Sequence, residues 1–274
     1  MDRYFEIKKR LLQTAATNDG LRAVILIGSS VREYAVADEY SDLDVILVCD
    51  EPEAWLYGDL PGMLGDVRIS FVEPTFGGGM ERRILYSGSL DVDLIVLTPE
   101  QMESAITGGV AGEVMNRGYC VLYDDMMITD RLKGIPARVQ RGAMTEREFL
   151  NIVNDFWFHA VWSAKKILRG ELWAAKMCID AYMKGLLLKI IEESEADNKD
   201  VWHNGRFLEK WAGGDTIAEL GNCFAHYDRE NMVSALSSTM VLCAKLARRT
   251  AEKRGYLYPA EAEACAMSFV KDRL

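Results

Sequence analysis

The sequence has few of the residues that build metal–sulfur centres, disulfides or membrane spans. Of 274 residues only three are histidine and six are cysteine, and the cysteines are scattered without close pairs. This spacing offers no zinc site and indicates reduced thiols, so we expect a cytoplasmic protein. No apolar run approaches the length of about 18 residues that a bilayer requires, and the N-terminal segment MDRYFEIKKRLL is polar. We therefore expect neither a membrane span nor a secretory leader.

Basic charge is also scarce. The chain has 32 Lys and Arg residues against 42 Asp and Glu residues, which gives a formal net charge of −10. No Lys/Arg stripe with interleaved aromatic residues is present, which argues against a duplex-binding protein or a nucleic-acid polymerase. An acidic protein is better matched to a cationic small molecule. We expect a monomer that has no nucleic-acid or membrane partner.

The first half of the chain mixes helical and strand patterns. Residues 3–16 have apolar side chains at helical spacing, and the segment after Pro99 predicts a helix with proline at its first position. Five short apolar runs bounded by Gly, Pro or Asp predict strands, at residues 22–27, 44–49, 66–74, 82–89 and 90–97. Strands interleaved with helices predict an α/β (α+β) domain over residues 1–138.

The second half has only helical patterns. Residues 145–170 begin with Thr145 and Glu148 in a capping-box arrangement and end at Gly170, which predicts one long helix. Helical spacing continues in three further segments, and no strand pattern returns. Residues 139–274 should therefore form an all-α helical bundle domain.

Two carboxylates stand at the start of the predicted strand in SDLDVILVCD. Side chains two residues apart on a strand face the same side, so Asp42 and Asp44 point together. At about 6 Å two such charges repel by roughly 3 kcal/mol at an effective dielectric constant near 20, so a basic group, water or a divalent cation must offset the cost. Magnesium is the ion that prefers carboxylate oxygens together with substrate phosphates. For this motif alone, two solvated acids at a strand entry are the simpler interpretation.

Two further segments favour the magnesium interpretation. The strand that ends in ILIGSS turns at Gly28 and Ser29, where a close backbone approach and a hydroxyl group suit phosphate oxygens. Asp91 and Asp93 lie on one face of the strand in LDVDLIVL and could supply a third carboxylate. Each segment is weak by itself, whereas the ordered set is fairly specific.

This ordered set resembles the signature of the nucleotidyltransferase superfamily. The segments GDVRISFVEP, DVDLIVLTP, HNGRFLEKW and YLYPAEAEACAMSFVKDRL further resemble the aminoglycoside 6-adenylyltransferase (streptomycin adenylyltransferase) family, along nearly the whole chain. The resemblance implies a mixed-sheet nucleotidyltransferase domain followed by a helical substrate-binding domain. It implies transfer of AMP from ATP, with Mg²⁺, to a hydroxyl of an aminoglycoside such as streptomycin, with release of pyrophosphate and antibiotic resistance as the outcome. One departure concerns the loop, which in the family commonly reads Gly-Ser-Arg; Ser30 stands here instead, so nucleotide contacts could be weaker or Arg32 could replace the arginine.

The resemblance also implies roles for individual residues. Asp42, Asp44 and Asp93 would bind the metal, Asp93 would also serve as general base, and Asp91 is its competitor. Gly28, Ser29 and Lys165 would contact the nucleotide, and Asp155 and Trp157 would contact a cationic acceptor. For Lys165 a solvated helix position, and for Trp157 a core position, are the competing interpretations. Lys184, Lys189, Arg169 and Glu171 match the family pattern too, although pairing on helix surfaces explains them equally well.

Three alternatives stay open at this point. The acceptor could be a lincosamide, another metabolite or a protein. The chain could be a catalytically silent binding module of the same fold, although such a module has no physical reason to keep clustered acids. A metal-dependent phosphohydrolase would bring histidines into the metal site, and this chain has none near the motif.

Overall fold

The computed structural model describes residues 2–32, 37–75, 78–135, 144–195 and 203–274. The chain forms two compact units, Met1–Gln140 and Arg141–Leu274. The predicted boundary between residues 138 and 139 lies outside the described residues. No helix in the described ranges is both long enough and apolar enough to cross a bilayer.

The first unit is a six-stranded mixed sheet with short helices on both faces. Its elements are, in chain order, α1 (Phe5–Ala15), β1 (Leu21–Ile27), a 3-10 turn (Gly28–Val31), β2 (Leu43–Cys49), α2 (Pro52–Leu56), a 3-10 turn (Leu60–Met63), β3 (Val67–Pro74), β4 (Met80–Tyr86), β5 (Leu90–Leu97), α3 (Pro99–Thr107), α4 (Val110–Met115), β6 (Cys120–Asp124) and α5 (Ile128–Leu132). The strand order is β3-β4-β5-β2-β1-β6. Only the pair β2 and β5 is parallel among the described strand pairs.

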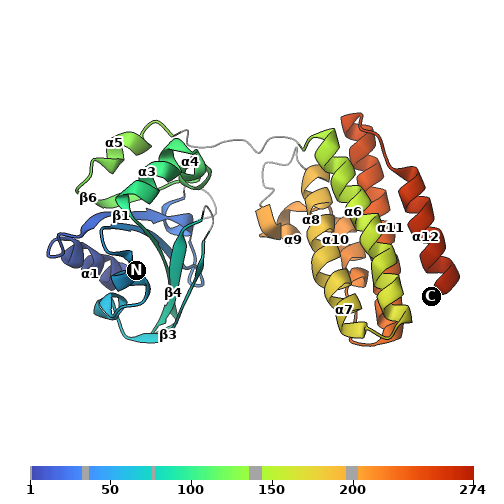
Figure 1. The fold of residues 1–274 in the computed structure, drawn as a ribbon, viewed down its shortest axis with the longest axis horizontal. Coiled ribbons are helices and arrows are strands. Elements are labelled where there is room, and N and C mark those ends of the chain that lie inside the picture. Colours follow the sequence, from blue (N-terminus) through green and yellow to red (C-terminus); the bar gives the residue numbers. More distant parts are fainter. Residues whose placement is uncertain (1, 33–36, 76–77, 136–143, 196–202) are drawn as a thin grey trace. The chain divides into compact units, whose positions relative to one another are not determined.

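Alternating side chains give this sheet two separate apolar cores. Leu11 of α1 and Trp55 of α2 pack with Leu47 on one face. Met102 of α3 and Ile128 of α5 pack with residues of opposite parity, such as Ile46, on the other face. Figure 1 shows α1 on one side of the sheet and α3, α4 and α5 on the opposite side. Both cores bury the central strands, which therefore hold fixed positions.

The sequence predicted most of these elements. The five expected strands correspond to β1–β5, and Pro99 opens α3 with a capping box between Thr98 and Gln101. The edge strand β6 was missed, because its five residues are only partly buried or exposed and lack a clear apolar alternation.

The second unit is a bundle of long helices. Its elements are α6 (Glu146–Leu168), α7 (Leu172–Met177), a π-helical turn (Cys178–Tyr182), α8 (Met183–Ser194), a 3-10 turn (His203–Gly205), α9 (Leu208–Trp211), α10 (Gly214–Leu220), a 3-10 turn (Gly221–Cys223), α11 (Arg229–Arg254) and α12 (Ala260–Arg273). Figure 1 shows α6, α8, α11 and α12 as its long members. The predicted capping box at Thr145 and Glu148 is confirmed at the start of α6. One apolar core joins all four helices.

Lys184 of α8 points into this bundle. Its ammonium donates hydrogen bonds to the carbonyl oxygen of Ile179 (3.0 Å) and to Oγ1 of Thr239 (2.8 Å), and it lies 5.0 Å from the centroid of the Phe224 ring. Burial lowers the pKa of Lys184 from its ordinary value of 10.5 to about 8. Surface pairing, the alternative left open for this lysine, is therefore not its environment.

Lys184 should make stability depend on pH. Because the folded protein releases this proton near pH 8 and the unfolded chain near 10.5, the unfolded state holds more protons between these values. The contribution of Lys184 to the free energy of unfolding therefore rises across this window and is lost as pH falls through 8. Denaturant unfolding of the wild type and Lys184→Met should show their stability difference changing by about 1–3 kcal/mol in favour of the wild type from pH 8 to 10. A difference independent of pH would contradict this account.

Candidate functional site

The candidate site is built on one cross-strand row of the sheet. The parallel register of β2 and β5 sets Asp44 beside Asp93, and the antiparallel register of β5 and β4 sets Asp93 beside Arg83. The row continues to Ile27 on β1 and to Phe71 on β3. Because directly paired residues have their side chains on the same face, the register alone brings two carboxylates and one guanidinium together.

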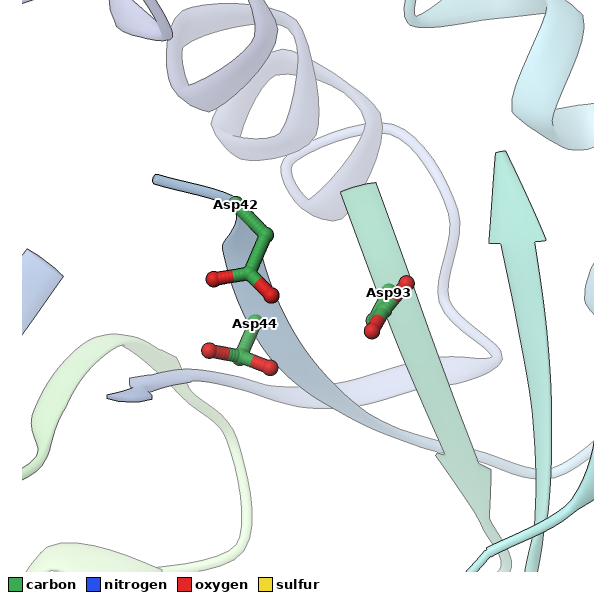
Figure 2. Close-up of side chains that lie close together, drawn as sticks. All are labelled: Asp42, Asp44 and Asp93. Atoms are coloured by element: carbon green, nitrogen blue, oxygen red, sulfur yellow. The ribbon is translucent and has the colours of Figure 1, made fainter. Parts of the chain in front are cut away.

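Asp42 lies just before β2, two residues from Asp44 and therefore beside this row rather than on it. One carboxylate oxygen from each of Asp42, Asp44 and Asp93 can be chosen so that all three lie within 4.8 Å of one another. Figure 2 shows Asp42 and Asp44 along one strand, with Asp93 on the strand beside them. Asp91, the competing candidate, is exposed and lies outside this group. The three acids selected from the sequence are thus the three that the fold assembles.

The loop after β1 lies against the same carboxylates. Gly28 has a φ of +74°, and a Cβ atom there would lie 1.8 Å from Oδ2 of Asp44, so only glycine fits. Ser29 follows, and its Oγ is buried without a hydrogen-bond partner among the described residues. Ser30 donates a hydrogen bond to the carbonyl oxygen of Ile27 (3.3 Å). A buried hydroxyl without a partner beside an acid group suits a ligand oxygen.

Asp93 is the most deeply buried of the three acids. Its side chain is 6% exposed, and Oδ2 accepts hydrogen bonds from Arg83 Nη2 (2.8 Å) and Nε (3.1 Å). Burial raises the pKa of the Asp93 carboxyl above its ordinary value of 3.8, although the Arg83 charge opposes this shift. Asp93 is therefore a stronger proton acceptor than a solvated aspartate.

In the helical unit, Asp155 lies on the accessible side of α6. Its Oδ2 accepts a hydrogen bond from the Tyr182 hydroxyl (2.9 Å), and its Oδ1 lies 2.6 Å from Nδ1 of His159. The rings of His159 and Tyr182 lie with their centroids 4.3 Å apart, tilted at 47° to each other. This arrangement sets an acid beside aromatic rings, which is an environment that suits an organic cation.

Trp157 and Lys165, both expected to contact ligands, have different surroundings. Trp157 is 2% exposed in the helical core, so a substrate cannot reach its ring in this arrangement. The exposed ring beside Asp155 is that of Tyr182 instead. Lys165 is exposed, with Nζ 5.6 Å from the centroid of the Phe269 ring on α12. Glu171 pairs with Lys166 and Arg169, as surface pairing predicts.

Sequence reasoning missed Arg83, His159 and Tyr182 as site residues. Arg83 has a detectable signal, because MERRILY alternates and places Glu81 and Arg83 on one face of a strand. Tyr182 has none, because its contact with Asp155 depends on how the π-helical turn packs against α6.

The fold and the site together define the class of this protein. The first unit has the mixed sheet expected of a nucleotidyltransferase domain, and the second is the helical bundle expected to follow it. A profile of the streptomycin adenylyltransferase family matches residues 1–273. The chain therefore belongs to this family of adenylyltransferases.

Individual relatives are distant in sequence. The chain is 22% identical over 268 residues to the aminoglycoside 6-adenylyltransferase of Bacillus subtilis (strain 168), covering 93% of this chain and 92% of the relative. A crystal structure of an aminoglycoside 6-adenyltransferase from Bacillus subtilis matches with a TM-score of 0.48 at 18% identity, covering 99% of this chain and 98% of that one. A spectinomycin adenyltransferase from Enterococcus faecialis, crystallised with ATP and spectinomycin, matches with a TM-score of 0.33 at 12% identity, covering 90% and 98%.

The close approach of Gly28 to Asp44 can be tested directly. Mn²⁺ serves here as a probe of the expected magnesium site. Gly28→Ala should displace the Asp44 carboxylate and weaken binding of Mn²⁺ by about tenfold or more, because a Cβ atom cannot share the space of Oδ2. Gly88→Ala is the matched control: Gly88 also has a positive φ, of +78°, but a Cβ there meets nothing within 4 Å. Both variants should lose about 1–3 kcal/mol from backbone strain. Equal Mn²⁺ affinity of the two variants by calorimetry would contradict the steric argument.

Proposed function

We propose that this protein transfers AMP from Mg-ATP to a hydroxyl group of an aminoglycoside such as streptomycin, releasing pyrophosphate. The observation that carries the proposal is the group formed by Asp42, Asp44 and Asp93 beside the Gly28–Ser29 loop, in a chain of the streptomycin adenylyltransferase family. Antibiotic resistance would be the biological outcome.

The donor set fits magnesium. Asp42, Asp44 and Asp93 offer three carboxylate oxygens within 4.8 Å. Mg²⁺ prefers carboxylate oxygens as ligands, together with water and substrate phosphates. These three residues would hold the ion. When bound, magnesium would neutralise charge that builds on the phosphates during transfer.

The protein's own groups account for the remaining chemistry. The half-buried turn of backbone at Gly28 would orient the phosphates, together with the hydroxyl of Ser29, which has no hydrogen-bond partner among the described residues. The acceptor oxygen attacks the α-phosphorus, the bond to the β-phosphate oxygen breaks, and pyrophosphate leaves. Asp93, with its raised pKa, would take the proton of the acceptor hydroxyl.

The helical unit would recognise the other parts of the substrates. Asp155, with Tyr182 beside it, would bind a cationic group of the acceptor. The net charge of −10 also favours a cationic acceptor. Lys165, an exposed point charge, would contact the triphosphate.

Turnover should depend on the assembled acids. Purified protein with Mg-ATP and a panel of aminoglycosides and lincosamides should release pyrophosphate, and one product should be heavier by one adenylyl group. Asp42→Asn and Asp93→Asn should each lower kcat by about 100-fold or more, because they remove a metal ligand or the base. Asp91→Asn, an exposed acid outside the group, should stay within about threefold of the wild type.

The outcomes distinguish the alternatives. A lincosamide product would keep the chemistry and change the acceptor. Stabilisation by Mg-ATP without any product would favour a silent binding module. Loss of turnover in Asp91→Asn with retention in Asp93→Asn would reverse the assignment of the base.

Acceptor binding should depend on Asp155. Asp155→Asn should raise KM for the cationic acceptor by about tenfold while KM for ATP stays unchanged, because one charge-assisted contact contributes on the order of 1.4 kcal/mol. Asp272→Asn, which removes an exposed acid of α12, is the charge-matched control. Equal acceptor KM values in the two variants would exclude Asp155 from the acceptor site.

A further inference from the structure

Arg83 donates hydrogen bonds to one of the two carboxylate oxygens of Asp93. Both of its hydrogen bonds, from Nη2 at 2.8 Å and from Nε at 3.1 Å, go to the same oxygen, Oδ2. Two donors on one oxygen use both of its lone pairs. Oδ1 accepts no hydrogen bond from the residues that the structure describes. Figure 2 shows the two oxygens of Asp93 on opposite sides, one toward Asp44 and the other away from it.

Other contacts hold Arg83 in this pose. Its Nε lies 3.4 Å from a carboxylate oxygen of Glu73 and 3.4 Å from one of Glu81, which are ion-pair distances rather than hydrogen bonds. Glu73 and Glu81 face each other across β3 and β4, two residue pairs along from the pair formed by Phe71 and Arg83. The guanidinium, whose side chain is 43% exposed, thus contacts acids on three strands, and both of its hydrogen bonds go to Asp93.

We propose that Arg83 is the positioning residue of the site: it holds Oδ2 of Asp93 so that Oδ1 alone faces the metal and the acceptor. This proposal rests on the proposed adenylyl transfer. With Oδ2 held, Asp93 cannot rotate to bind an ion through both oxygens, and Oδ1 keeps one direction throughout the reaction. Planar guanidinium suits this task, because its rigid fork fixes orientation, whereas a lysine supplies only a point charge.

The charge of Arg83 and its positioning of Asp93 affect two different measurements: the charge affects Mn²⁺ affinity, and the positioning affects kcat. Arg83→Gln removes a positive charge close to the acids, so Mn²⁺ should bind as tightly as in the wild type or several-fold more tightly. The same variant frees Asp93 to rotate, so kcat should fall about 10- to 100-fold with KM for ATP within about threefold. A merely structural role would instead weaken metal binding and turnover together.

Arg83→Lys keeps the positive charge but removes the planar guanidinium group. It should keep the Mn²⁺ affinity of the wild type, because the charge stays, and its kcat should lie between those of the wild type and Arg83→Gln. Arg68→Gln is the charge-matched control, because Arg68 lies on β3, pairs with exposed Asp66, and has no contact in the row. It should retain both the metal affinity and the turnover of the wild type.

The experiment combines calorimetric titration with Mn²⁺, melting without ligands, and steady-state kinetics on the full chain. Tighter or equal Mn²⁺ binding with reduced kcat in Arg83→Gln supports the proposal. Weaker Mn²⁺ binding by Arg83→Gln, or turnover within twofold of the wild type, overturns it. If Arg83→Gln does not fold, a kcat of Arg83→Lys equal to that of the wild type overturns it as well. Failure of the proposed function would appear separately, as a wild type that yields no adenylylated product, and the Mn²⁺ affinities would then still test Arg83.

Discussion

Repulsion among the neighbouring carboxylates of Asp42, Asp44 and Asp93 is the constraint on which the site depends. Oxygens of Asp42, Asp44 and Asp93 gather within 4.8 Å, where each pair of charges repels by about 3 kcal/mol at an effective dielectric constant near 20. The strands that carry these acids cannot separate, because the parallel pairing of β2 with β5 is held by apolar cores on both faces of the sheet. Arg83 offsets part of this repulsion, and Glu73 and Glu81 share its charge. The fold thereby holds the three carboxylates at a site where a bound divalent cation would offset their repulsion.

Residues that break ordinary folding rules surround this row. Gly28 adopts a left-handed conformation against Asp44, Ser29 buries a hydroxyl that has no partner in the described part of the chain, and Asp93 is a buried acid with a raised pKa. Each feature costs stability, and none improves the packing of the sheet. Elsewhere the side chains of this sheet alternate regularly between its two faces. Losses of stability that are concentrated at one place are typical of a preorganised binding site. The helical unit shows a smaller example in Lys184, a largely buried cation that donates two hydrogen bonds to described residues.

The sequence could predict the acids but not the neighbours that define their chemistry. Strand alternation places Asp42 with Asp44 and Asp91 with Asp93, because that pattern is local. The choice between Asp91 and Asp93 depends on which residue of β5 pairs with Asp44, and register is a property of two strands. Arg83 needs the register of a further pair, and Tyr182 reaches Asp155 only through the packing of a π-helical turn on α6. Periodicity alone predicted only an α/β half followed by a helical half. The family resemblance supplied the particular fold of the first unit and the role of the second.

Anomalous diffraction would test the central claim most directly. Crystals of the full chain grown with Mn²⁺ and a non-hydrolysable ATP analogue would locate the cation and the phosphates together. The account predicts an anomalous peak among Asp42, Asp44 and Asp93, with phosphate oxygens against Gly28 and Ser29. A cation held elsewhere, with these three carboxylates free of it while the nucleotide is bound, would contradict the account.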